Sequence, residues 1–209
     1  MYVPDAFSET DFLKITQLID EFPLAMFVAC KNDDIIVHHI PMIMDGKSAL
    51  VAHIAKANDL HKKLQDNDLV KIIFRGADGY VSPNWYPSKM DTHRAVPTWN
   101  YQAVHVSGHV QFIHSEREKR AIVGRMTQKF ERMLTDHDPW RMADAPKDYM
   151  DNMINAVVGM RIVISDIIAK SKLSQNRADA DVMGAVKQFQ QRGLTKLASK
   201  MAEHQEKKP

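Results

Sequence analysis

Residues 24–53 read LAMFVACKNDDIIVHHIPMIMDGKSALVAH, and this stretch decides the fold class. It contains three apolar runs of strand length, separated by short polar turns: 24–30, 35–40 and 49–53. Asp45-Gly46 is a hairpin signal, because these residues accept the positive φ angles of a tight turn. Residues 32–34 form a second polar turn. Strands that follow one another through hairpins pair in the antiparallel sense. We therefore expect an antiparallel sheet or a small β-barrel.

The rest of the chain adds strands and peripheral helices, which makes the class α+β. Ser8 and Asp11 approximate a capping box and predict a helix from Ser8 that Pro23 ends. Strands are predicted at 70–74, 80–82, 100–113 and 157–168, with a turn at Asp78-Gly79 between the first two. Helices are predicted at 115–134, 149–156, 179–192 and 195–204, with short helical turns within 54–66. The apolar stripe of the first of these helices is Ile122, Met126, Phe130 and Met133. The proline-bounded segment 83–97 is predicted to be a loop.

The length of 209 residues predicts one main domain, residues 1–175, with a C-terminal helical extension, 176–209, packed on it. The last residues, 205–209, are expected to be disordered. The 28 basic and 26 acidic residues are interspersed, which argues against a surface devoted to duplex DNA. The N-terminus lacks the features of a signal peptide, and no apolar run approaches the ~20 residues of a membrane span. A cytoplasmic protein is expected.

The single cysteine, Cys30, lies inside an apolar run, so we expect a buried structural thiol. No Gly-rich phosphate loop follows a strand, and no nucleophile elbow occurs. The sequence therefore yields no catalytic residues. His105 and His109 lie four residues apart on one predicted strand and share a face, but no carboxylate accompanies them, which is weak support for a metal.

The chemistry-bearing stretch is Lys170-Ser171-Lys172-Leu173-Ser174-Gln175-Asn176-Arg177, directly after the apolar run that ends at Ile168. Cationic, amide and hydroxyl side chains alternate within eight residues. Such a density of hydrogen-bonding groups suits an anionic ligand rich in heteroatoms, such as a phosphorylated cofactor. The alternative is an exposed turn that also caps the helix after it.

Two further motifs place aromatics beside small polar residues: Tyr80-Val81-Ser82-Pro83-Asn84-Trp85-Tyr86 and Val96-Pro97-Thr98-Trp99-Asn100-Tyr101. Together with 172–177, the opening residues 1–4, the segment 53–58 and Pro139-Trp140, they run in order along nearly the whole chain. In this set the chain resembles the PaiB family, described as FMN-binding negative transcriptional regulators. The resemblance implies an antiparallel split β-barrel, related to flavin reductases and pyridoxamine-phosphate oxidases. It also implies a homodimer with FMN in a cleft between the subunits.

An FMN site must neutralise a phosphate, hydrogen-bond the ring edge and cover the flat ring. For the phosphate we favour His53 and Lys56, at a strand end that enters a helical turn, with Asn58 in the same motif. PaiB-like sequences often carry Arg in place of Lys56, and Pro-X-Trp after the residue matching Asn58. The alternatives are a strand-end histidine satisfied by backbone and a plain helix cap.

The remaining candidates fall into three groups by role. Amides and hydroxyls suit the ring edge and the ribityl chain: Ser82, Thr98, Asn100, Gln175 and Asn176. Aromatics suit the cover of the ring: Trp85, Tyr86 and Trp99. Lys172 and Arg177 suit a phosphate from the partner subunit, or form surface ion pairs. For each aromatic the alternative is packing in the core. Because some split-barrel relatives bind haem, His105 and His109 keep haem open as a second cofactor.

Three functions remain open from the sequence. The first is an FMN-binding PaiB-like regulator, although the sequence shows no helix-turn-helix and no basic recognition helix. The basic helix 115–134 could lie along a phosphate backbone, but its charges also suit i,i+4 pairs such as Glu116–Arg120. The second is a flavin-dependent oxidoreductase or flavin reductase without direct DNA binding. The third is a dimeric protein that has lost its affinity for flavin.

Overall fold

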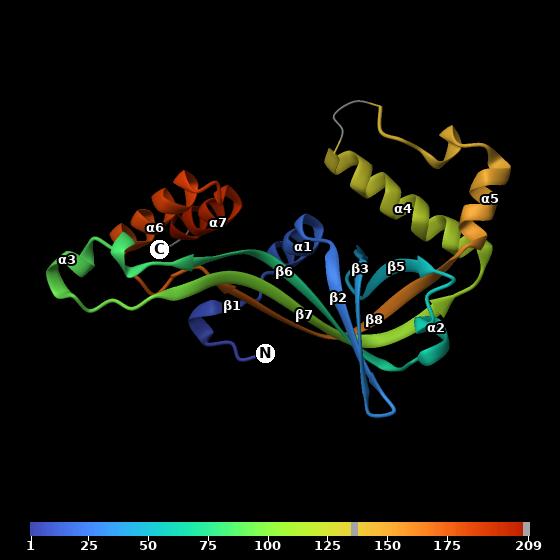
Figure 1. Cartoon of the computed structure of the whole chain (residues 1–209), viewed down its shortest axis with the longest axis horizontal. Helices are drawn as coiled ribbons and strands as arrows, with labels where there is room; N and C mark the ends of the chain where they lie inside the picture. Colours follow the sequence, from blue (N-terminus) through green and yellow to red (C-terminus); the bar gives the residue numbers. More distant parts are fainter. Residues whose placement is uncertain (135–137, 207–209) are drawn as a thin grey trace. The chain divides into compact units, whose positions relative to one another are not determined.

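The computed structural model describes residues 1–134 and 138–206, with the side chains of 205 and 206 excepted. Eight strands form one sheet in the order β3-β2-β6-β7-β8-β5-β4, and β1 pairs with β8 (Figure 1). The antiparallel α+β class expected from the hairpin signals is confirmed. The strands are β1 (Ser8–Glu9), β2 (Leu24–Lys31), β3 (Asp34–Pro41), β4 (Ile43–Asp45), β5 (Ala49–Ala55), β6 (Leu69–Val81), β7 (Thr98–Ile113) and β8 (Val157–Lys172).

The helices lie between and after the strands: α1 (Phe12–Glu21), α2 (Leu60–Lys63), α3 (Ser88–Thr92), α4 (Glu116–Leu134), α5 (Lys147–Asn155), α6 (Asp179–Gln191) and α7 (Thr195–Glu206). The chain divides into two compact units. Unit 1 comprises Met1–Ile15, Arg75–Val104 and Ile168–Pro209, and unit 2 comprises Thr16–Phe74 and His105–Ile167. In the described part of the chain, no helix is long and apolar enough to cross a membrane.

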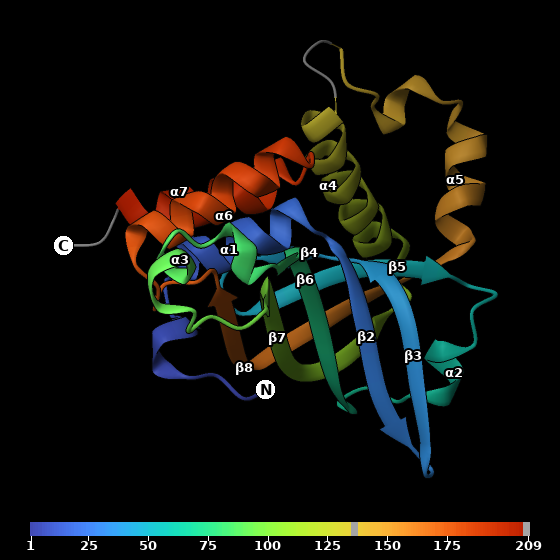
Figure 2. The same ribbon diagram turned by 60° about the vertical axis from the view of Figure 1, so that its left-hand side comes forward.

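Unit 2 contains the predicted hairpins. β2 pairs with β3 from Leu24 opposite Pro41 to Lys31 opposite Asp34, and the turn between them places Asn32 and Asp33 at positive φ. β4 pairs with β5 across the Asp45-Gly46 turn (Figure 2). Asparagine, aspartate and glycine tolerate this left-handed conformation, so these short turns close without strain.

Helix α4 covers the β4–β5 face of unit 2. Its Ile122 and Met126 are buried against Ile43 and Val51, and Phe130 packs at the margin. The predicted apolar stripe is thus correct over its first three members. The prediction is wrong for its fourth member, Met133, which is 51% exposed in the last turn of the helix. This turn extends beyond the cluster that contains Ile43 and Val51.

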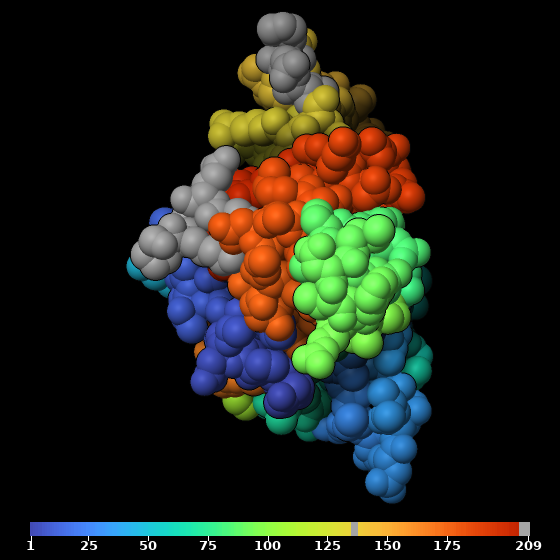
Figure 3. Space-filling view, turned by 90° about the vertical axis from the view of Figure 1, so that its left-hand side faces the viewer, coloured from blue at the N-terminus to red at the C-terminus, as the bar shows by residue number. Residues whose placement is uncertain are grey.

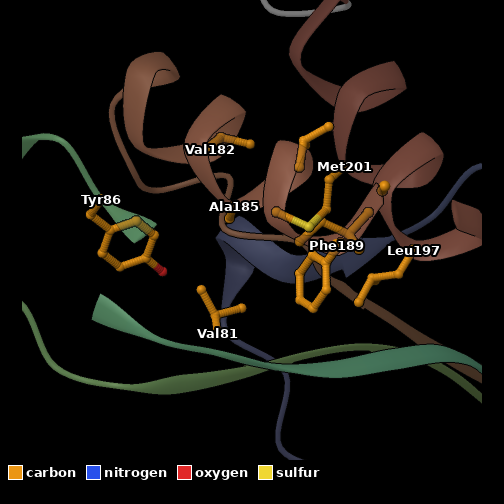
Figure 4. Close-up of a cluster of buried hydrophobic side chains, with 10 residues drawn as sticks. Val81, Tyr86, Val182, Ala185, Phe189, Leu197 and Met201 are labelled. Atoms are coloured by element: carbon orange, nitrogen blue, oxygen red, sulfur yellow. The ribbon is translucent and has the colours of Figure 1, made fainter. Parts of the chain in front are cut away.

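Unit 1 is built around α6 and α7, which pack on the end of β6. Val182, Ala185 and Phe189 of α6 meet Leu197 and Met201 of α7, and Figure 4 shows these side chains converging over the strand. Gly193, at φ +77°, separates the two helices as predicted. Because each helix presents an apolar stripe toward the same strand, the buried surface of three elements stabilises the group.

Strand β6 corrects the prediction of a turn at Asp78-Gly79. The strand runs without interruption from Leu69 to Val81. Gly79 is required by packing: a Cβ there would lie 2.7 Å from a ring carbon of Phe189 and 3.0 Å from Leu197. A glycine in a strand often marks such a close approach, and its turn propensity misled the prediction.

Three other local predictions are corrected. Ser8 belongs to strand β1, and the first helix begins at Phe12, with the Asp11 carboxylate accepting the Leu13 N–H at 2.9 Å. Segment 83–97 includes a 3-10 turn and helix α3 and is not all loop. Cys30 is exposed, because on β2 the alternating positions Ala25, Phe27 and Ala29 take the buried face. Alternation along a strand outweighs the apolar character of the run.

Helix α6 lies against the segment between β6 and β7 inside unit 1 (Figure 3). A Cβ at Gly184 would lie 2.2 Å from the Trp85 carbonyl oxygen, so only glycine permits this approach. The Asp181 carboxylate, 3% exposed, accepts the Ser88 N–H at 3.0 Å and the Ser88 hydroxyl at 2.7 Å. Two backbone elements far apart in sequence are thereby held together.

Candidate functional site

The polar stretch 170–177 is the end of a strand followed by a tight turn. β8 continues through Lys172, so Lys170 and Ser171 lie in the sheet and are buried. Ser174 adopts φ +67°, and its carbonyl accepts the Arg177 N–H at 3.0 Å. The segment does not cap α6, because the N-cap of that helix is Ala178, which makes no side-chain cap bond.

Two of the predicted amides are used inside unit 1. The Gln175 side-chain oxygen accepts the Leu173 N–H at 2.7 Å, and its amide nitrogen donates to the Ser171 carbonyl. Asn100 is fully buried, and its amide exchanges hydrogen bonds with the Ser174 hydroxyl at 2.9 and 3.2 Å. These bonds hold the turn to β7. Asn176, by contrast, is exposed and makes no recorded hydrogen bond with any described residue.

A cluster of cations lies along this turn: Lys170, Lys172 and Arg177. Lys172 donates to the Thr98 hydroxyl and to the Trp99 carbonyl, the latter at 2.6 Å. Burial lowers the pKa of Lys172, and the neighbouring charges of Lys170 and Arg177 lower it further. Within the described residues neither lysine has a carboxylate within ion-pair distance. The two lysines therefore carry positive charge that an anionic ligand would neutralise.

Lys170 is 7% exposed and is held from both sides by aromatic groups. Its ammonium lies 5.2 Å from the Tyr101 ring and 5.7 Å from the Tyr2 ring, and it donates to the Tyr2 carbonyl at 3.1 Å. These ring contacts and the carbonyl are the partners recorded for this ammonium among the described residues. Sequence reasoning included Lys170 in the polar stretch but not among the candidate site residues.

An exposed aromatic pair stands on neighbouring strands of the same unit. Trp99 and Tyr80 are each 49% exposed, and their rings meet edge to face with centroids 6.1 Å apart. The Trp99 indole N–H donates to the Asp78 carboxylate at 2.9 Å, which fixes the ring plane. Such a fixed, exposed face suits a flat ligand ring. Tyr80 was not predicted, although it opens the quoted motif 80–86.

The other two predicted ring-covering residues lie in or against the hydrophobic core of unit 1. Tyr86 is 2% exposed, and Figure 4 places it beside Val81. Its buried hydroxyl has no hydrogen-bond partner among the described residues. Trp85 meets the Phe189 ring edge to face at 5.2 Å, and the Arg192 guanidinium lies 4.8 Å from its ring. The Ser82 hydroxyl likewise has a local role, because it accepts the Asn84 N–H at 3.2 Å.

The predicted phosphate residues lie on unit 2. His53 is on β5, and its buried Nδ1 has no hydrogen-bond partner among described residues. Burial lowers the pKa of His53, which favours the neutral ring. The Lys56 side chain is exposed and has no recorded carboxylate partner in the described part of the chain. Asn58 precedes Asp59, the N-cap of α2, and its side-chain oxygen accepts the Leu60 N–H at 3.0 Å.

Groups of the kinds that FMN requires are present on each unit. On unit 2, the Lys56 ammonium has no carboxylate partner and the buried His53 Nδ1 has no hydrogen-bond partner among the described residues. On unit 1, Lys172 has no carboxylate partner among the described residues, and the Trp99 ring is exposed. Asn100 and Gln175, by contrast, form hydrogen bonds within unit 1.

The described residues contain no group of three or more His, Cys, Asp or Glu side chains placed to hold a metal ion. His105 and His109 lie on β7, with His105 partly buried and His109 exposed. Burial lowers the pKa of His105, which favours the neutral imidazole. A neutral imidazole is the form that ligates metals, but two such rings on one strand do not define a metal site.

Comparisons with known proteins show similarity to FMN-binding domains. A family model described as "Putative FMN-binding domain" matches residues 1–166. The chain is 29% identical over 193 residues to "Protease synthase and sporulation protein PAI 2" of Bacillus subtilis, covering 91% of this chain and 89% of that protein.

Solved structures share the fold. The FAD and heme binding protein from Mycobacterium smegmatis matches with a TM-score of 0.61 at 18% identity, over 84% of this chain and 78% of that one. The flavocytochrome Anf3 from Azotobacter vinelandii matches with a TM-score of 0.57 at 16% identity, over 79% and 69%. These likenesses confirm the antiparallel split β-barrel expected from the sequence.

Proposed function

The chain belongs to this family of FMN-binding domains, and we propose that it is a PaiB-like negative transcriptional regulator that binds FMN as a homodimer. The cofactor is FMN, which supplies a redox-active flat ring when bound. The observation that best supports a ligand-binding role is the pair Lys170 and Lys172, which have no carboxylate partner among the described residues, with Lys172 bonded to the backbone of the exposed Trp99. We place the flavin in a cleft between the two subunits, as the family resemblance implies.

The role of Lys172 in this proposal is tested by FMN titration. The Lys172→Gln variant keeps a hydrogen-bond donor for Thr98 and loses the charge. A charged hydrogen bond is worth about 1.5–3 kcal/mol, so FMN affinity should fall about ten- to hundredfold. Flavin fluorescence quenching measures the FMN affinity of the parent and of the variant.

Lys187→Gln on the exposed face of α6 is the matched control, since it removes the same charge from the same unit. Lys56→Ala with Lys62→Ala as its control tests the phosphate role on unit 2 in the same assay. Parent affinity retained in both Lys172→Gln and Lys56→Ala would contradict the assigned residues. A parent protein that ignores FMN would contradict the flavin proposal itself.

Most of the positive charge of helix α4 is already paired. Four of its six basic side chains bind within unit 2: Lys119 is buried and donates to the Val157 carbonyl, Arg120 pairs with Glu116 and Asp151, Arg125 with Asp45, and Lys129 with Asp20. The predicted Glu116–Arg120 pair is confirmed at 3.1 Å. We therefore propose that repression does not require α4 to lie along a phosphate backbone and acts through a protein partner.

Fluorescence anisotropy with a duplex from the gene's own upstream region tests this route. Each phosphate contact steepens the dependence of log affinity on log salt by about 0.9. We expect weak binding that the Arg117→Gln variant leaves unchanged. Tight binding that weakens steeply with salt and falls in this variant would contradict the indirect route. Light scattering of the purified protein tests the homodimer, and a monomer at all concentrations would contradict it.

A further inference from the structure

A pocket of about 680 Å³ lies on unit 2, lined by α4 and residues 139–142. We name it the α4 pocket. Its walls include Thr127, Gln128 and Arg132 of the helix, and Trp140, Arg141 and Met142 of the facing segment. The volume is within the range of small-molecule sites in proteins, about 300–1,000 Å³. None of the residues predicted to bind FMN lines it.

The charge of this pocket is not balanced. Arg120 and Arg125 also line it, but carboxylates neutralise them. Burial acts to raise the pKa of Asp45, yet its bonds to Arg125 and Arg161 lower that pKa overall, which marks a tight pairing.

Arg132 and Arg141, however, have no carboxylate within ion-pair distance in the described part of the chain. Two neighbouring acids accept backbone N–H groups: Glu131 that of Trp140 at 3.1 Å, and Asp144 that of Arg141 at 2.8 Å. Among the described residues, the two guanidinium groups therefore remain available to an anion, and their planar donor array suits phosphate or carboxylate.

The rest of the lining is suited to a flat ring. Trp140 is 43% exposed, and the bond from its backbone to Glu131 helps to position it. Met142 lies half-buried against α4, where its sulfur would be 3.4 Å from a Cβ at Gly124. The Thr127 hydroxyl and the Gln128 amide make no recorded hydrogen bonds with described residues and add polar groups at the wall. Aromatic rings bind well to such a combination of indole, thioether and guanidinium.

We infer that the α4 pocket binds a small aromatic monophosphate, with the ring against Trp140 and the phosphate on Arg132 and Arg141. This is a second ligand site, separate from the proposed flavin site. It does not rest on the regulatory proposal. It would give the protein an input from a nucleotide-like metabolite.

Calorimetric titration of the FMN-saturated full chain tests the inference, with AMP and phenyl phosphate as probes. Two further probes separate these features: inorganic phosphate carries only the anion, and adenosine carries only the aromatic ring system. We expect the aromatic phosphates to bind at least tenfold more tightly than either half. The double variant Arg132→Gln/Arg141→Gln should weaken this binding at least tenfold, and Trp140→Leu should reduce the preference for AMP over inorganic phosphate.

The matched control is Arg117→Gln, which removes an exposed α4 charge outside the pocket and should leave AMP affinity unchanged. Circular dichroism and FMN affinity of each variant verify that the fold and the flavin site are intact. Absence of binding of both probes at millimolar concentration, or equal affinity in the double variant, overturns the inference. Displacement of AMP by excess FMN would also overturn it, because the site would then not be separate.

Discussion

Single glycines in unit 1 decide how closely its backbone segments approach. Gly184 faces the Trp85 carbonyl. A Cβ at position 184 would lie 2.2 Å from the Trp85 carbonyl oxygen and 3.2 Å from the Pro87 Cδ. Neither neighbour is a flexible side-chain end, so the contact cannot relax without moving a whole segment. Glycine is chosen here by packing, and helix propensity would have favoured alanine.

The Gly184→Ala variant is therefore expected to lower the free energy of unfolding by about 1–3 kcal/mol, the usual cost of overpacking. Urea denaturation measures this change. Gly124→Ala on α4 is the matched control, since its Cβ meets only the Met142 sulfur at 3.4 Å. The control should gain up to about 1 kcal/mol from helix propensity. Equal stability of the two variants would contradict the packing argument.

At the level of elements, Asp181 connects helix α6 with the segment between β6 and β7. Its carboxylate accepts two hydrogen bonds from Ser88 while 3% exposed. A buried carboxylate with such partners stabilises the arrangement, whereas removal of the carboxylate leaves the Ser88 donors unsatisfied.

Replacement of this carboxylate in Asp181→Ala should cost about 2–3 kcal/mol, because each unsatisfied buried donor costs about 1–3 kcal/mol. Native-state proteolysis should then cleave within 83–97 more rapidly, since α6 no longer holds this segment. Asp179→Ala, two residues earlier and exposed, is the control. Cleavage rates that match in the two variants would show that Asp181 does not secure the segment.

For the whole molecule, stability should depend on pH through its buried histidines. Burial lowers the pKa of His53 and of His105. The folded chain therefore keeps these rings neutral, while the unfolded chain takes up protons below the ordinary histidine pKa of about 6.5. The contribution of these two histidines to the free energy of unfolding is fully present above about pH 6.5, and it is lost as the pH falls from there through their lowered folded-state pKa values.

We expect the free energy of unfolding to decrease from pH 7.5 to pH 5, as measured by urea denaturation at each pH. The double variant His53→Gln/His105→Gln should show a shallower decrease, and the exposed His93→Gln control should follow the parent. Lowered pKa values also occur at Asp45 and Asp68, and because a lowered carboxyl pKa lies further below this pH range, they do not contribute to the decrease. An unchanged slope in the double variant would refute the assignment.

The sequence by itself determined the antiparallel α+β class, most strand positions and the likeness to an FMN-binding family. These follow from local signals, because alternation along a strand and the positive φ of Asp45-Gly46-type turns act within a few residues. The polar stretch 170–177 could also be singled out, since its composition departs from that of a simple connection.

Only the tertiary structure decided what the polar and aromatic side chains do. Asn100 and Gln175 satisfy neighbouring backbone and hydroxyl groups, while Trp85 and Tyr86 fill the core of unit 1. Gly79 continues a strand because Phe189 lies over it, more than one hundred residues later in the chain. The physical reason is that hydrogen-bond partners and packing neighbours far apart in sequence compete with local preference, and burial favours them.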